Sequence, residues 1–282
     1  MDDELFELVY RIACQLWPRR EKRVQYSGRQ IVLMYYWSVI RGKPRAWVCD
    51  PRNLPARLLD MPIPSRSQFC RRLNTIDIQT MLDAIEQQLN QVSNTALIGC
   101  WFIDAKPLTI SPYSKDKAAR WGWAYDRKAR GYKLFAMTDP TGRVVAWHVG
   151  GMNESEPAVA QKLIKAMDRP GYLMGDSICD SNLLHESTAA MDVQLIAPRK
   201  QPERPISKRA RHPQRLHAIA MLETFCNGFG RTMYNLRTHI ERQFAVMASS
   251  RVGLDHLPGF IRTPPRVHRW IQAKLVLYAL IQ

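Results

Sequence analysis

The chain has 282 residues, of which 46% are hydrophobic and 23% are charged, a composition typical of a soluble globular protein. It is long enough to bury a full core, and we expect one medium-sized domain with a smaller one. Forty-one Lys and Arg against 25 Asp and Glu give a net charge of +16, which favours a polyanionic partner. A basic surface that is merely solvated is the alternative.

Several classes of protein are excluded by simple features of the sequence. The six cysteines lie far apart without a CxxC pair, so neither a zinc site nor a disulfide framework is expected. The N-terminal stretch MDDELFELVYR carries acidic residues where a secretory signal needs basic ones. The longest apolar stretch, residues 31–40, is too short to span a bilayer. We therefore expect a cytoplasmic protein without a membrane partner.

The first 95 residues have the periodicity of helices throughout. An apolar stripe at helical spacing covers residues 2–17, and a second apolar helix is expected from about Gln30 to Ile40. A short helix is expected after Asp50, and Pro64-Ser65 opens another with the sequence SQFCRRL. A long amphipathic helix then carries apolar residues from Ile78 to Val92. This region is predicted to form an all-helical N-terminal domain.

From residue 97 onward, strand-forming residues become common. Three strands are predicted in the stretches LIGCWFIDAKPLTI, RGYKLFAMTD and GRVVAWHVG. An Asp-Pro-Thr-Gly turn joins the last two into a hairpin. A helix from Ser155 to Met167, a strand in GYLMGD, a helix from Asp180 to Ala190 and a strand in VQLIAP follow. This order predicts an α/β fold with a mixed sheet flanked by helices.

Two aspartates lie in or at the end of predicted strands. Asp104 lies within the apolar run WFIDAKP, where an ionised side chain is costly unless its charge is compensated. Asp176 ends GYLMGD, at the carboxyl end of a strand, where ligands of open α/β sheets gather. A salt-bridged residue is the alternative for Asp104. A helix N-cap is the alternative for Asp176, although Asp180 and Ser181 are better placed for that role.

A third acid, Glu241, lies in a helix predicted from about Met233 to Ser250. Tyr234, Arg237 and Glu241 are spaced i, i+3 and i+7, so they share one face of that helix. A surface pair of Arg237 and Glu241 that supports an exposed helix is the alternative interpretation.

The combination of the three acids predicts more than each acid alone. Three carboxylates brought into one pocket would repel one another unless a cation neutralised them. Oxygen ligands without His or Cys partners point to Mg²⁺ or Mn²⁺ rather than zinc. Two such ions can activate an attacking oxygen and stabilise the leaving oxygen of a phosphate ester. In a basic protein, this pattern suggests phosphoryl transfer on nucleic acid.

Four stretches between about residues 97 and 282 resemble the DDE transposases of bacterial insertion sequences, close to the IS4 and IS5 groups. WFIDAKPL and GYLMGDSICD resemble the segments that bear the two catalytic aspartates. DKAARWGWAYDRKARGYKLF, followed by GGMNESEPAV, is similar to the family's Gly-Tyr-Lys-Leu region and the loop after it. YNLRTHIER resembles the Tyr-x-x-Arg-x-x-x-Glu signature.

The resemblance implies an RNase H-like fold, with a helical DNA-binding domain over residues 1–95 and a catalytic domain over 96–282. It implies two Mg²⁺ or Mn²⁺ ions per active site, held by Asp104, Asp176 and Glu241. These three acids are also the expected catalytic residues. The resemblance further implies DNA contacts from Tyr234 and Arg237.

The expected activity is DNA transposition, in which strands are cleaved at the element ends and joined to target DNA. The partners would be double-stranded DNA, namely terminal inverted repeats and target, and a second copy of the chain on DNA. The location would be the bacterial nucleoid. Two positions depart from the family pattern: Ala248 stands where Lys or Arg is common, and Phe135 stands where His is frequent.

Two basic segments are candidates for DNA contact outside the three acids. SQFCRRL is a possible recognition helix, offering Arg66, Arg71 and Arg72, although a solvated helix in a packed bundle is the alternative. Residues 199–215 form a basic loop with seven basic residues and one acid, including Lys208, Arg209 and Arg211.

The chain's tryptophans are a further candidate for nucleic-acid contact. Trp101, Trp121, Trp123 and Trp147 could stack on bases, but core or sheet-face positions are the commoner use of tryptophan.

Three rival functions are open at this point. A DNA-binding protein descended from a transposase would keep the basic surface without metal-dependent cleavage. A nuclease of the same fold would cut DNA without joining it. A purely structural helix bundle would leave Asp104 in a strand unexplained.

Overall fold

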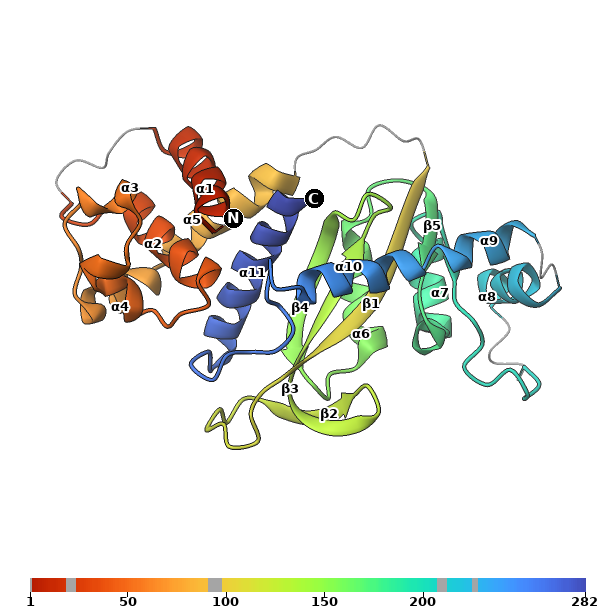
Figure 1. Ribbon diagram of the computed structural model, residues 1–282. Helices are drawn as coiled ribbons and strands as arrows, with labels where there is room; N and C mark the ends of the chain where they lie inside the picture. The colour runs from red at the N-terminus through yellow and green to blue at the C-terminus, as the bar shows by residue number, and fades with distance from the viewer. Residues whose placement is uncertain (1, 19–23, 91–97, 207–211, 225–227) are drawn as a thin grey trace. The chain divides into compact units, whose positions relative to one another are not determined.

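The computed structural model describes residues 2–18, 24–90, 98–206, 212–224 and 228–282 (Figure 1). Contacts divide the chain into two compact units. A helical unit combines Met1–Val92 with Met247–Gln282, and a sheet unit comprises Ser93–Val246. The predicted mixed α/β fold with an all-helical N-terminal region is confirmed.

The helical unit contains the helices that periodicity predicted within residues 1–95. Its elements are α1 (Asp2–Leu16), α2 (Gly28–Ile40), η1 (Trp47–Cys49), η2 (Pro51–Asn53), α3 (Ala56–Leu59), α4 (Arg66–Leu73), α5 (Ile76–Asn90) and α11 (Pro264–Ile281). Helix α2 is central, because it contacts α1, α4, α5 and α11. Nearly every side chain of α2 is therefore buried, and the helix is apolar on all sides rather than amphipathic.

Helix α11 shows why the contact-based division differs from the boundary expected from the sequence. The resemblance implied a catalytic domain over residues 96–282, whereas contacts group residues 247–282 with the helical unit. Helix α11 packs against α1, α2 and α5. Trp270 and Tyr278 are 2% and 1% exposed, so the last helix contributes large side chains to the core of the helical unit.

The sheet unit is built on a mixed six-stranded sheet. Its strands are β1 (Gly99–Thr109), β2 (Arg120–Ala124), β3 (Arg127–Thr138), β4 (Val144–Gly151), β5 (Gly171–Met174) and β6 (Val193–Ile196). The strand order is β2-β3-β1-β5-β6, and β4 also pairs with β3. Strands β2, β3, β4 and β1 are joined by antiparallel pairings, whereas β5 and β6 continue the sheet in parallel. All predicted strands are present.

Strand β2 was missed by the sequence analysis, which expected three consecutive strands before the first helix of this unit. The stretch Trp121-Gly122-Trp123-Ala124 does alternate, but its large residues face solvent and its small residues face the protein. This pattern is the reverse of the one that identifies a half-buried strand. Burial of apolar side chains therefore gave no signal for β2.

One face of the sheet is covered by α6 (Glu156–Leu163) and α7 (Asn182–Ala189). Trp101, Ile103 and Phe135 point into the core on this side, together with apolar residues of both helices. The neighbouring residues of β1 point to the opposite face, because side chains alternate along a strand. There Phe102 stacks on His239 of α10 (Thr238–Ala248), with ring centroids 5.8 Å apart.

The segment between β6 and α10 is more helical than the sequence suggested. Helix α8 (Pro213–Ile219), a π-helical turn (Ala220–Thr224) and helix α9 (Phe229–Asn235) lie within it. The helical pattern predicted from about Met233 to Ser250 is present, but as two helices rather than one. It breaks between α9 and α10, where the backbone N–H groups of Leu236 and Arg237 donate to carbonyls three residues earlier.

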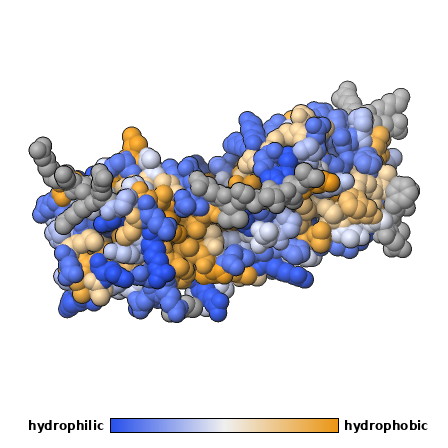
Figure 2. Space-filling view, turned by 90° about the horizontal axis from the view of Figure 1, so that it is seen from above, coloured by the Kyte–Doolittle hydropathy of each residue, from blue (hydrophilic) through white to orange (hydrophobic). Residues whose placement is uncertain are grey.

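Hydrophilic residues cover much of the face shown in Figure 2, and apolar residues form smaller patches on it. Among the described helices, none combines the length and the apolar character that crossing a lipid bilayer demands. The five described cysteines are all free thiols.

Candidate active site

A pocket of 490 Å³ lies in the sheet unit, and carboxylates from several elements line it. Asp104 comes from β1, Asp176 follows β5, Glu156 begins α6 and Glu241 lies in α10. The lining also includes Ala105, Lys106, Pro107, Trp123, Tyr125, Lys133, Ile178, Phe244 and Ala245. The three acids singled out from the sequence therefore share one pocket with a fourth that was not predicted.

The pairing of two parallel strands explains why Asp104 and Asp176 are neighbours. In the ladder between β1 and β5, Phe102 is the partner of Met174. Asp104 and Asp176 each follow two residues later, so they occupy matching positions just beyond the last paired residues. Adjacent strands lie about 5 Å apart, which brings the two side chains to the same edge of the sheet.

Burial and neighbouring acids make an ionised Asp104 costly. Its side chain is 22% exposed. Burial is the main reason that the pKa of Asp104 rises to about 6, and repulsion from Asp176 and Glu156 raises it further. The backbone N–H of Ala105 donates to Oδ1 of Asp104 at 2.7 Å and opposes the rise, as does the charge of Arg237. Burial and the two acids together outweigh these opposing contributions.

Asp176 has a local structural role in addition to its place in the pocket. Its Oδ1 accepts a hydrogen bond from the N–H of Ile178 at 3.0 Å, so it caps the 3-10 turn Ser177–Cys179. The N-cap alternative is therefore correct for this short turn. The following helix α7 is capped by Ser181, as expected, through the N–H of Leu184 at 3.4 Å. The cap uses one oxygen of Asp176, and Asp176 still lines the pocket.

Arg237 links two of the predicted acids. Its Nη2 donates to Oε1 of Glu241 at 2.7 Å, and its Nη1 lies 3.7 Å from Oδ2 of Asp104. The guanidinium also lies over the ring of Tyr234, 5.8 Å from its centroid. The predicted surface pair of Arg237 and Glu241 exists, but it also reaches the buried Asp104. Arg237 therefore supplies positive charge at the edge of the carboxylate pocket.

These carboxylates have the chemistry of ligands for a hard divalent cation. Oxygen ligands from Asp and Glu are those that Mg²⁺ and Mn²⁺ prefer. Within the described parts of the chain, however, no group of three or more Asp, Glu, His or Cys is spaced to hold a metal ion. Glu241 is 51% exposed and paired with Arg237, so it would have to exchange that partner for a metal.

Two residues of the pocket were missed by the sequence analysis. Lys133 of β3 donates from Nζ to Oε1 of Glu156 at 2.6 Å, and both side chains are largely buried. Lys133 lies in the Gly-Tyr-Lys-Leu block, and Glu156 lies in the segment GGMNESEPAV. Both segments contributed to the family resemblance, but no single residue within them was singled out. Nothing in the one-dimensional pattern distinguished Glu156 from its neighbour Glu154. Only the fold brings Glu156 to the pocket.

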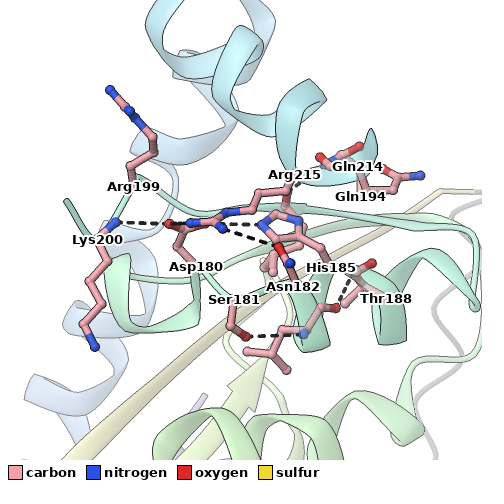
Figure 3. A network of polar contacts seen from close by, with 12 residues as sticks. Asp180, Ser181, Asn182, His185, Thr188, Gln194, Arg199, Lys200, Gln214 and Arg215 are labelled. Carbon is pink, nitrogen blue, oxygen red and sulfur yellow. Dashed lines mark hydrogen bonds and ion pairs between the residues drawn. The ribbon is translucent and has the colours of Figure 1, made fainter. Parts of the chain in front are cut away.

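A further acid, Asp180, is neutralised by its own network (Figure 3). Arg215 donates to both of its carboxylate oxygens, at 2.6 and 2.7 Å, and the N–H of Lys200 donates at 3.1 Å. Burial would raise the pKa of Asp180, but the nearby His185, 3.6 Å away, and hydrogen bonds from Arg215 and Lys200 outweigh it and lower the pKa to about 2. Asp180 therefore anchors the start of the basic segment to α7 and α8 and is not a free ligand.

The basic residues predicted to contact DNA outside the pocket differ in their exposure to solvent. Helix α4 is capped by Ser65 in a capping box, and it exposes Arg66 and Arg71 while burying Phe69 and Leu73. Arg72 is half-buried and pairs with Asp77 at 3.2 Å. Lys208, Arg209 and Arg211 lie outside the described residues.

Comparison with known proteins gives one family match and one similar structure. A solved structure, the piggyBac transposase synaptic complex with hairpin DNA, is similar at 10% identity with a TM-score of 0.45. That similarity covers 99% of this chain and 72% of the other. No curated protein matches. Residues 98–280 match the family described as the transposase DDE domain. Since the match covers well over half of the chain, this protein belongs to the transposase DDE domain family.

Proposed function

We propose that this chain is an active transposase that cleaves DNA strands at the ends of a mobile element and joins them to target DNA. One observation carries the proposal: Asp104, Asp176 and Glu241, from three separate elements, line one pocket. Membership of the transposase family and the net charge of +16 support it. The partner would be double-stranded DNA, comprising the element's terminal inverted repeats and the target.

The residues of the pocket have distinct roles in this proposal. Two divalent ions, Mg²⁺ or Mn²⁺, would activate the attacking oxygen and stabilise the leaving oxygen of the phosphodiester. Asp104 and Asp176 would hold the ions at the edge of the sheet, and Glu241 would complete the ligand set from α10. Asp104 is suited to this role because desolvation and like charges already favour a compensating cation there.

Arg237 would change partners when DNA enters. In the described structure it neutralises Glu241 and lies near Asp104. Once cations bind these acids, its guanidinium would be free to contact a phosphate oxygen, which suits the planar fork of arginine. Tyr234, whose ring lies against Arg237, would limit the directions in which that side chain can turn.

Two features beyond the pocket are included in the proposal. The exposed Arg66 and Arg71 of α4 would contact DNA in the helical unit. Two DNA ends must be held together for transposition, so we expect at least a dimer on DNA, in the bacterial nucleoid.

The test is strand cleavage on a duplex that carries the DNA flanking the gene, with Mg²⁺ present. Asp104→Asn, Asp176→Asn and Glu241→Gln should each abolish cleavage while DNA binding persists. Asp168→Asn is the matched control, because Asp168 is an exposed acid paired with Arg169 outside the pocket. Cleavage by Asp176→Asn at the wild-type rate would refute the assignment.

A second function is favoured by the pair between Arg237 and Glu241 and by Ala248. A transposase-derived DNA-binding protein could retain a closed pocket in which arginine replaces the metal. Such a protein would bind DNA but show no magnesium-dependent nicking.

A related nuclease would nick DNA but fail to join pre-cleaved ends to target DNA in a strand-transfer assay.

A further inference from the structure

Strand β2 carries a row of aromatic side chains that the fold leaves in solvent. Trp121 and Trp123 are 63% and 62% exposed, and Tyr125, in the turn that follows, is 76% exposed. Residues two apart on a strand share a face, so the two indoles stand side by side. We call Trp121, Trp123 and Tyr125 the aromatic row. Its last two members also line the carboxylate pocket.

The aromatic row is not needed to build the core. On the opposite face of β2, Gly122 and Ala124 pack closely on the protein. A Cβ atom added at Gly122 would lie 2.4 Å from the carbonyl oxygen of Met152, and Ala124 is 1% exposed. The strand therefore buries its small side chains and exposes its largest ones. Contiguous exposed aromatic side chains on an edge strand commonly mark a binding surface.

The backbone at Tyr125 supports a binding role. Tyr125 is the first of two residues that connect Ala124 to Arg127 in the hairpin, and its φ is +58°. Glycine, asparagine and aspartate dominate such turn positions, because a bulky side chain is strained at positive φ. Since Tyr125 is 76% exposed, burial of its ring does little to offset this strain. Such strain persists most often at ligand-binding sites.

Positive charges accompany the aromatic row. Lys128 of β3 is the cross-strand partner of Trp123, so the two side chains lie on the same face of the hairpin. Arg120 and Arg127 are exposed too, but they lie on the Gly122 and Ala124 face of the hairpin. Flat aromatic faces with a cation beside them match a nucleic-acid strand, whose bases stack on rings and whose phosphates bind cations.

We propose that the aromatic row stacks unpaired bases of the DNA strand whose phosphate enters the carboxylate pocket. The inference rests on the proposed function, because it requires DNA at that pocket. Bases inside an intact duplex already stack on one another and present only their edges, so the row would bind nucleotides that have left the helix. It would thereby favour a frayed or opened DNA end over continuous duplex.

The test compares two DNA probes with the full-length chain in EDTA, so that no cleavage occurs. Fluorescence anisotropy would measure affinity for a labelled oligothymidylate of about twelve nucleotides and for a duplex of the same length. Trp121→Ala and Trp123→Ala should each weaken binding of the single strand about 5- to 150-fold, and leave duplex binding unchanged. Trp123→Phe should retain most of the affinity.

Two further variants separate binding from folding. Tyr125→Gly should weaken single-strand binding while its thermal unfolding midpoint stays the same or rises, because glycine removes the strain at φ +58°. Tyr113→Ala is the control, since Tyr113 is 93% exposed but does not line the pocket.

Three results would overturn the inference. The first is an equal loss of affinity for both probes, and the second is no loss relative to Tyr113→Ala. The third is that Trp123→Ala dissociates a homodimer in sedimentation and leaves oligothymidylate affinity intact, because the row would then be an interface between copies. None of these results alters the cleavage test of Asp176→Asn, so the two proposals fail separately.

Discussion

Neutralising Asp104 should stabilise the metal-free protein. Burial and the neighbouring acids give Asp104 a pKa of about 6 in place of 3.8. A difference of this size means that the ionised carboxylate costs the folded state about 3 kcal/mol relative to the neutral side chain. Asparagine has nearly the same shape and no charge. In EDTA at about pH 8, Asp104→Asn should therefore raise the free energy of unfolding by about 3 kcal/mol.

The pH dependence follows from the direction of the pKa change. A carboxyl whose pKa is raised on folding binds its proton more tightly in the folded state, so wild-type stability falls as pH rises from about 4 through about 6. The variant has no such group to titrate. The difference between the two proteins should therefore vanish near pH 4 and be complete above pH 7, approximately one pH unit beyond the folded pKa.

Urea denaturation across this pH range is the assay. Adding Mg²⁺ should stabilise the wild type and not Asp104→Asn, because only the wild type offers the ionised ligand. Asp168→Asn is a control that should change the free energy of unfolding in the opposite direction, because a hydrogen bond from Arg169 lowers the pKa of Asp168. The reasoning is refuted if Asp104→Asn is less stable than wild type at pH 8, or if the difference is the same at pH 4.

Two other substitutions test the scaffold around the site. Gly122→Ala should lower the free energy of unfolding by about 1–3 kcal/mol, because the new methyl would meet the Met152 carbonyl oxygen. Gly259→Ala, which adds a methyl into open space, should change it little. Asp180→Asn should lower the free energy of unfolding by about 2 kcal/mol at neutral pH, because the pKa of Asp180 is lowered to about 2 on folding. This stabilisation by Asp180 is present above pH 4 and is lost as the pH falls towards 2. Equal stability of Asp180→Asn and wild type at neutral pH would show that the pairing with Arg215 contributes nothing.

The amino-acid sequence alone was sufficient to predict most elements of the fold. Apolar periodicity predicted α1, α2 and α5, and strand-forming runs with turn residues predicted β1, β3 and β4. These signals are local, because a helix or strand that buries one face must repeat apolar residues at its own period. The two aspartates could also be singled out locally, as acids within or at the end of apolar strands.

Other features depended on long-range contacts that leave no local periodicity. Strand β2 escaped prediction because its exposed face holds the large side chains and its inner face is fixed by backbone contact at Gly122. Residues 247–282 joined the helical unit because α11 buries its large side chains against α1, α2 and α5. A helical pattern shows which residues are apolar, but not which partner they cover.

The pocket itself was decided by the tertiary structure. Parallel pairing of β1 with β5 placed Asp104 beside Asp176, although 72 residues separate them in the sequence. Folding also brought Glu156 and Lys133 to the same place, although neither had a distinguishing pattern in the sequence. The types of residue present thus determined which chemistry was possible. The strand order and register determined which of these residues lie together, because contacts between distant segments exist only in the folded chain.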